Sequence, residues 1–192
     1  TIILKRNDPT AAARQVSLTE LGSIKINKEE RTKMLKTIPR NSIIGFLIGV
    51  LPGAGATIAS FLAYGMERNL VSDEEKEKFG KGSVHGLAAP ETANNAACSG
   101  AFVPLLTLGI PGSGTTAVML GALLGFGIQP GPRLYETNPE IFWSVIMSMY
   151  IGMVVLLILN LPLIPYIARI LAVPRTFLIP MILFFSVTGI YL

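Results

Sequence analysis

The sequence has one cysteine, one histidine and one tryptophan among 192 residues, and only 15% of its residues are charged. A single cysteine, Cys98, cannot form a disulfide within the chain, which excludes a disulfide framework and a cysteine-rich metal site. We therefore expect no redox chemistry and no cofactor. Hydrophobic residues make up 51% of the chain, and this proportion with so little charge is typical of a membrane protein.

The charge that is present is concentrated near the start. Residues 1–40 contain nine Lys or Arg against four Asp or Glu, and the cations of residues 28–40 lie next to the first apolar run. This matches the excess of Lys and Arg on the cytoplasmic side of membrane proteins, and an ordinary solvated linker would look the same. We expect a cytoplasmic polar segment over 1–40 and a transmembrane transport region over 41–192. The chain opens on Thr1 and stops inside an apolar run, so we expect it to be a piece of a longer protein.

A repeated motif interrupts the apolar sequence. Residues 42–66 carry no charged side chain over 25 positions, enough to cross a bilayer, but Pro-Gly-Ala-Gly-Ala-Thr at 52–57 divides them. The motif recurs 59 positions later as Pro-Gly-Ser-Gly-Thr-Thr at 111–116, with four of six residues identical. Backbone groups freed by a helix break in a bilayer must find protein, cavity or ligand partners. A break that occurs twice with the same motif therefore predicts a functional role for these turns.

These patterns predict an all-α integral membrane protein with spanning helices. Two of its helical elements would be discontinuous or re-entrant, broken at the Pro-Gly-x-Gly turns, and the sequence does not choose between a broken span and a hairpin. The residues expected to break helices are Pro52, Pro90 and Pro111. Residues 67–81 are dense in both charges and predict a charged connector outside the membrane.

The two turns are candidate binding sites for a carboxylate and a cation. A broken helix exposes N–H groups from one half and carbonyl groups from the other, and glycine lets a ligand approach the backbone closely. The candidate residues are Gly53, Ala54, Gly55, Thr57, Gly112, Ser113, Gly114, Thr115 and Thr116. Neither turn has the Lys of a phosphate-binding P-loop. The alternative is that these small residues only permit tight helix packing.

Polar residues between the turns form a second group of candidates. Glu91 is the only charged residue between Lys81 and Arg133, and Asn94 and Asn95 follow it. An ionisable group at membrane depth is costly, so Glu91 is expected to orient the site or take part in ion coupling, while the asparagines offer polar ligands. Alternatively, Glu91 caps a helix that starts after Pro90, and the asparagines hydrogen-bond between helices.

The order of these motifs resembles the large membrane subunit of the bacterial tripartite tricarboxylate transporters. The runs that carry the resemblance are Ile-Gly-Val-Leu-Pro-Gly-Ala-Gly-Ala-Thr-Ile-Ala-Ser-Phe-Leu-Ala-Tyr at 48–64, Ala-Pro-Glu-Thr-Ala-Asn-Asn-Ala-Ala at 89–97, Pro-Leu-Leu-Thr-Leu-Gly-Ile-Pro-Gly at 104–112 and Gly-Ile-Gln-Pro-Gly-Pro at 127–132. One departure is Thr92, where the family pattern has Ser, and the hydroxyl is kept. The resemblance covers residues 40–192, and the family subunit is much longer.

The resemblance implies a multi-pass secondary transporter of the bacterial inner membrane. Such a subunit works with a small membrane subunit and a periplasmic solute-binding protein, and moves citrate or other carboxylates by symport with an ion, Na⁺ or H⁺. The family's motifs are carried over to residues 52–57, 90–95 and 111–116. No metal beyond such a Na⁺ is expected, and no nucleic acid.

Two other functions remain open from the residues alone. The first is a membrane enzyme with Glu91 and His85 as acid and base, although no set of nucleophile, base and orienting residue is visible. His85 could also shuttle protons, or hydrogen-bond at a helix interface. The second is a purely structural or channel-like membrane component whose glycine turns only pack helices.

Overall fold

The computed structural model describes residues 26–170 and 175–191, and this part of the chain is helical, without strands. It divides into two compact units, Ile26–Tyr150 and the described residues from Ile151 onward. The all-α class predicted from the sequence is confirmed for these residues.

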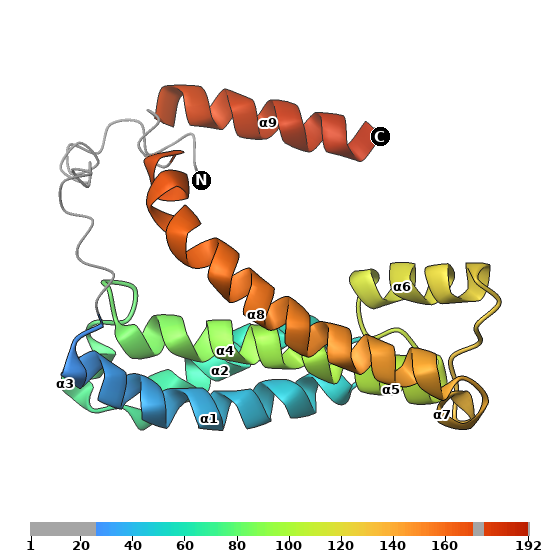
Figure 1. The fold of residues 1–192 in the computed structure, drawn as a ribbon. Helices are drawn as coiled ribbons and strands as arrows, with labels where there is room; N and C mark the ends of the chain where they lie inside the picture. Colours follow the sequence, from blue (N-terminus) through green and yellow to red (C-terminus); the bar gives the residue numbers. More distant parts are fainter. Residues whose placement is uncertain (1–25, 171–174, 192) are drawn as a thin grey trace. The chain divides into compact units, whose positions relative to one another are not determined.

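Three helices make the core of the first unit. They are α1 (Lys28–Val50), α2 (Gly55–Leu70) and α4 (Val84–Gly100), and Figure 1 shows them lying side by side. The chain reverses at residues 51–54, so α2 returns antiparallel along α1, and α4 then runs parallel to α1. A four-residue helix, α3 (Asp73–Lys76), lies in the connection from α2 to α4. The segment interrupted by the first motif is therefore a helical hairpin.

The core is built from small residues. Ala59 and Ala63 of α2 and Ala93 and Ala97 of α4 are fully or almost fully buried. Between α1 and α4 the backbones touch: a Cβ added to Gly45 would lie 2.4 Å from the carbonyl oxygen of Ala93. Gly49 meets Ala97 in the same way one turn further along. Close packing through small residues is the usual mode of helix association in membranes.

The second motif follows the core helices. Helix α5 (Phe102–Leu108) ends at Gly109, whose left-handed φ of 69° allows the turn that closes the helix. Residues 110–113 then lead to α6 (Gly114–Gly125), and α7 (Leu134–Thr137) comes after a loop. Pro111 thus lies between two helices, as Pro52 does between α1 and α2, and both prolines stand where the sequence predicts helix breaks.

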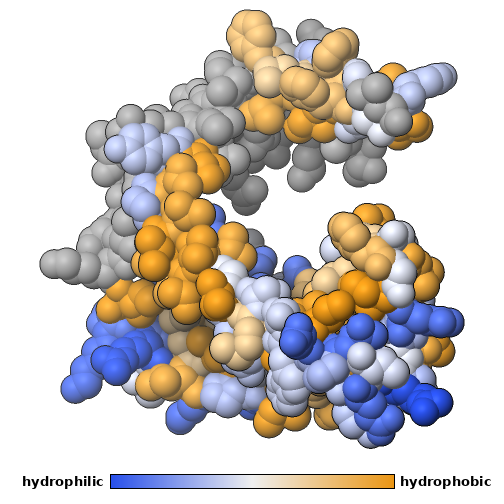
Figure 2. Space-filling view, turned by 45° about the vertical axis from the view of Figure 1, so that its right-hand side comes forward, coloured by the Kyte–Doolittle hydropathy of each residue, from blue (hydrophilic) through white to orange (hydrophobic). Residues whose placement is uncertain are grey.

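The last two helices are strongly hydrophobic. In α8 (Pro139–Ile170), the segment Pro139–Ile164 is long and apolar enough to cross a membrane, and Figure 2 shows hydrophobic side chains gathered along this helix. The consecutive residues 154–159 are all apolar and each at least 47% exposed, so this part of the helix is hydrophobic all round. A helix that is hydrophobic all round is typical of a membrane span. A shorter apolar helix, Phe177–Tyr191, makes up most of α9 (Arg175–Tyr191).

Two features differ from the sequence-based expectations. Pro90 does not break a helix, because α4 runs through it. Glu67, expected in the solvated connector, belongs to α2 and is fully buried. A proline inside a helix removes one backbone hydrogen bond and can be accepted where packing compensates, which composition alone does not show.

Candidate functional site

The first Pro-Gly-x-Gly turn is open. Gly53 and Gly55 have φ of 85° and 69°, and a Cβ added to either would meet nothing within 4 Å. Ala54 occupies the N-cap position of α2, and no side chain caps the helix there. Positive φ explains the glycines, because L side chains rarely adopt it. The start of α2 therefore presents backbone N–H groups without a capping side chain, as a site for an anion would require.

The second turn shares four of its six residues with the first but has a different conformation. Gly112 and Gly114 have ordinary φ values, and the left-handed glycine lies earlier, at Gly109. Ser113 caps α6: its hydroxyl accepts a hydrogen bond of 3.2 Å from the N–H of Thr116. The hydroxyl of Thr116 in turn accepts from the N–H of Ser113 at 2.8 Å. These two candidates are thus engaged in a capping box, while Thr115 is exposed.

The fold brings the two repeats close together. Gly112 is buried, and a Cβ added to it would lie 3.3 Å from the Cβ of Ala101 and 3.7 Å from the carbonyl oxygen of Gly49. Gly49 lies three positions before Pro52, so the second turn packs against the end of the helix that leads into the first. The packing role that the sequence offered as an alternative applies to Gly112, Gly49 and Gly45, and not to Gly53 or Gly55.

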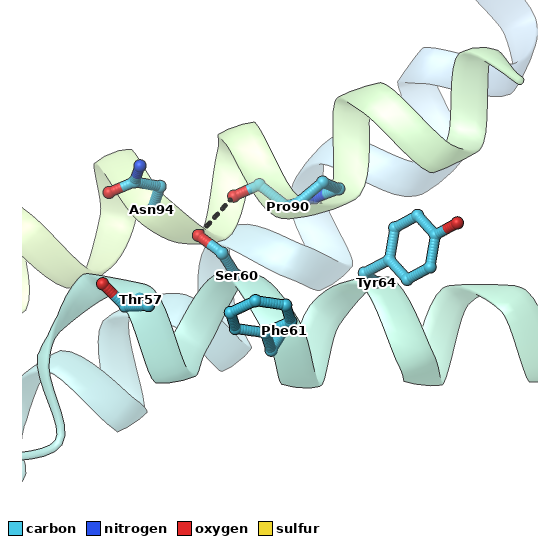
Figure 3. Close-up of a pocket in the computed structure, with 6 residues that line it drawn as sticks. All are labelled: Thr57, Ser60, Phe61, Tyr64, Pro90 and Asn94. Carbon is cyan, nitrogen blue, oxygen red and sulfur yellow. Dashed lines mark hydrogen bonds between the residues drawn. The ribbon is translucent and has the colours of Figure 1, made fainter. Parts of the chain in front are cut away.

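A groove of about 380 Å³ lies between α2 and α4. Its lining residues are Thr57, Ser60, Phe61, Tyr64, Pro90 and Asn94, shown in Figure 3. Thr57 and Asn94 lie at one end and Tyr64 at the other. Between them, the hydroxyl of Ser60 donates a hydrogen bond of 3.2 Å to the carbonyl of Pro90. Thr57 and Asn94, two candidates 37 positions apart in sequence, therefore share one groove.

Two other candidates on α4 do not line this groove. Glu91 and Asn95 are exposed, and the amide of Asn95 donates a hydrogen bond of 2.8 Å to the backbone carbonyl of Glu91. Positions four apart lie on one face of a helix, whereas Asn94 is turned toward α2. Glu91 is also not the cap of a helix starting after Pro90, because α4 begins at Val84 with Ser83 as its N-cap.

A polar cluster that the sequence analysis missed ties the three core helices together. At its centre is the carboxylate of Glu67 on α2, with a fully buried side chain. From α1, the hydroxyl of Thr37 donates to it at 2.9 Å, the amide of Asn41 donates at 3.0 Å, and Arg40 forms an ion pair with it. From α4, Nδ1 of His85 lies 3.0 Å from the same carboxylate. We refer to these five residues as the Glu67 cluster.

The electrostatics of this cluster favour an ionised carboxylate despite its burial. Burial alone would disfavour the charge, but Arg40 supplies a positive charge and Thr37 and Asn41 supply neutral donors. A signal for the cluster was present in the sequence. Arg40 and Glu67 are the charged residues on either side of the uncharged run 42–66. In a hairpin the two ends of such a run must meet, which a broken span would not require.

The structure does not unite the acid and base suggested for an enzyme. His85 contacts Glu67, and Glu91 is exposed elsewhere on α4. Among the described residues, no group of three or more His, Cys, Asp or Glu side chains is arranged to hold a metal ion. What the structure offers is a groove with hydroxyl, amide and carbonyl groups beside a charged cluster.

Comparison with known proteins gives the class of protein. The sequence model of the tripartite tricarboxylate transporter TctA family matches residues 2–192. An Agrobacterium vitis protein described as the uncharacterized 52.8 kDa protein in the TAR-I ttuC' 3' region is 41% identical over 186 residues, which cover 97% of this chain and 37% of that protein. Another protein from the same organism, described as an uncharacterized protein in the TAR-II ttuC' 3' region, is 46% identical over 147 residues, which cover 77% of this chain and 60% of that protein.

The chain belongs to the TctA family of tripartite tricarboxylate transporters. This confirms the resemblance found in the sequence motifs, and with the apolar helix α8 it indicates a membrane protein. The chain spans between about a third and three-fifths of the length of these two relatives. No solved structure matches it.

Proposed function

We propose that this chain is part of a secondary transporter subunit that binds a tricarboxylate or related carboxylate and moves it across the bacterial inner membrane, driven by an ion gradient. The observation that carries the proposal is the groove between α2 and α4, which Thr57 and Asn94 both line beside the uncapped start of α2. Both residues belong to motifs carried over from the family. The proposal extends family membership to an activity and a site.

The groups in and beside the groove suit a carboxylate. The hydroxyls of Thr57 and Tyr64 and the amide N–H of Asn94 can donate hydrogen bonds to carboxylate oxygens, and the positive end of the α2 dipole favours an anion. None of the six lining residues is charged, so a bound anion would keep part of its charge uncompensated. A co-bound Na⁺ held by oxygens such as the carbonyl of Asn94 would offset it.

The proposed partners follow from the family. The small membrane subunit would complete the membrane assembly, and a periplasmic solute-binding protein would deliver the substrate. Within this assembly, α8 is proposed as a full membrane crossing, and the α1–α2 hairpin as a re-entrant element that brings its turn to the depth of the substrate. The outward-facing Glu91 and Asn95 are left out of the proposed site.

The test is uptake of radiolabelled citrate and other carboxylates by proteoliposomes that contain the complete transporter, with and without a Na⁺ gradient. Asn94→Ala is expected to lower uptake by about ten- to a hundredfold, because losing a hydrogen bond to a charged group costs about 1.5–3 kcal/mol. Asn95→Ala is the matched control, since it removes the same amide one position along the same helix and should keep near-normal uptake. Equal activity of both variants and wild type would overturn the groove as the site, and absence of gradient-driven uptake in wild type would overturn the function.

A further inference from the structure

The Glu67 cluster is not used by the carboxylate groove, and its composition is unusual for a simple clamp. It combines a buried carboxylate, an imidazole and a guanidinium from three different helices. Burying charge is costly, and apolar residues of similar size often hold helices together as well. A buried ionisable group within a membrane protein is by default a candidate for function.

We propose that Glu67 and His85 form a proton-binding site of this transporter, and that its protonation couples a pH gradient to movement of α2. The inference rests on the proposed function, because coupling requires a transported substrate. It names H⁺ as a coupling ion and places the binding site at the end of the core opposite the first Pro-Gly-x-Gly turn.

The geometry provides a route for the proton. The side chain of His85 is 12% exposed, whereas that of Glu67 is fully buried, so the imidazole is the member that water can reach. A proton from water binds the free ring nitrogen of neutral His85 and gives imidazolium. When α2 moves and Arg40 no longer holds the carboxylate ionised, the Nδ1 proton passes over the 3.0 Å to a carboxylate oxygen of Glu67, leaving a neutral imidazole and a neutral carboxylic acid. Release of the proton later in the transport cycle reverses these steps.

The cluster has hydrogen-bonding partners for both protonation states. With Glu67 ionised, Thr37, Asn41 and Arg40 donate to it. With Glu67 protonated, the new O–H needs an acceptor. The hydroxyl of Thr37 can accept it, and the amide oxygen of Asn41 is buried without a partner among the described residues. The Nε–H of Arg40 is likewise buried without a partner in the described part of the chain, so the cluster holds both an unused acceptor and an unused donor that a second arrangement of its hydrogen bonds can engage.

Protonation would weaken the contact between α1 and α2. The ionisable groups that contact the Glu67 carboxylate are Arg40 from α1 and His85 from α4. In the connector, Glu75 pairs with Lys33 instead. Neutralising Glu67 changes the formal charge of the cluster from zero to +1 and removes the partner of Arg40. Because α2 also forms one wall of the groove, loosening its end provides a physical link from proton binding to the carboxylate site.

The experiment uses the complete transporter in proteoliposomes and compares net citrate uptake driven by an imposed pH gradient with citrate counterflow at equal pH. We expect Glu67→Gln and His85→Asn to lose stimulation by the gradient and to keep counterflow, because exchange of bound substrate needs no net proton transfer. Glu75→Gln, which removes a less buried carboxylate, should keep both. His85→Asn retains a polar group near the Nδ1 position and gives the answer if Glu67→Gln fails to fold.

The remaining outcomes separate the two proposals. Retained pH-gradient stimulation in both variants, or equal loss of counterflow and driven uptake, would overturn the proton site and leave a structural clamp. Counterflow in wild type without any effect of the pH gradient would overturn proton coupling but support citrate transport. If wild type moves no citrate at all, proton binding is measured directly by the infrared band of a protonated carboxyl group on acidification. A band that is present in wild type and absent in Glu67→Gln supports proton binding by Glu67. Absence of the band in wild type overturns the proton site.

Discussion

The hydroxyl of Thr37 on α1 donates a hydrogen bond of 2.9 Å to the carboxylate of Glu67 on α2, although the two residues are 30 positions apart and the chain reverses direction between them. This contact closes the hairpin at the end opposite residues 51–54. The start of α1 and the connector that contains α3 therefore emerge at the same end of the three-helix core.

The first prediction concerns topology. In the complete protein with Cys98→Ser, cysteines introduced by Lys28→Cys or Asp73→Cys should react with a membrane-impermeant maleimide from the same side, because both positions are exposed at one end of the hairpin. By the excess of Lys and Arg near residue 28, that side should be the cytoplasm. The Cys98→Ser protein without a new cysteine is the control. Labelling from opposite sides would show that residues 42–66 cross the membrane as a broken span.

The second prediction concerns the contact between α1 and α4. A Cβ added to Gly49 would lie 2.2 Å from the carbonyl oxygen of Ala97, so Gly49→Ala should force the helices apart and destabilise the protein by about 1–3 kcal/mol. Gly65→Ala is the matched control, because a Cβ there meets nothing within 4 Å and alanine favours a helix by up to about 1 kcal/mol. Thermal unfolding of the purified variants in detergent measures the change in stability for each substitution. A normal midpoint for Gly49→Ala would contradict the close packing.

The third prediction concerns pH. Hydrogen bonds from Lys78 and from Lys33, which lies 3.1 Å away on α1, lower the pKa of the Glu75 carboxyl below its ordinary value. A lowered pKa in the folded state means that the interaction stabilises the fold above the ordinary pKa and is lost as the pH falls through the folded value. Hydrogen exchange of the Lys76 and Glu77 amides, which donate to the carbonyls of Ser72 and Asp73, should therefore be slowed at neutral pH, after correction for its intrinsic pH dependence, and lose protection in acid.

The control for this experiment is Glu75→Gln. It should show reduced protection of α3 already at neutral pH and a much weaker dependence on acid, because glutamine cannot ionise. Arg31→Gln, which changes an exposed cation of α1, should behave like wild type. An unchanged acid response in Glu75→Gln would assign the pH dependence to another group.

Much of the fold was accessible from sequence because its signals are local. A long uncharged run, Pro-Gly pairs and a charged segment are enough to place helix ends near Val50 and Gly55 and to predict the apolar helix that contains residues 141–161. The repeat was equally visible. Its two copies nevertheless differ in conformation, because Ser113 caps the helix that follows it and Ala54, at the corresponding position, has no side-chain oxygen to do so.

The site was harder to predict because it depends on which helix faces which. Asn94 and Asn95 look equivalent in the sequence, and only the position of α2 shows that Asn94 lines the groove. Glu67 looks like the start of a solvated connector until the hairpin places Arg40 and Thr37 beside it. Such pairings join residues 26 to 30 positions apart, and local periodicity carries no information about them.

Pro90 has a mechanical consequence for α4. Proline has no N–H, so the backbone hydrogen bond that would link position 90 to Gly86 is missing, and the helix is more easily bent there. His85 lies on one side of this joint and Asn94 on the other. His85 of the Glu67 cluster and Asn94 of the groove therefore belong to two segments of α4 whose relative angle can change at Pro90.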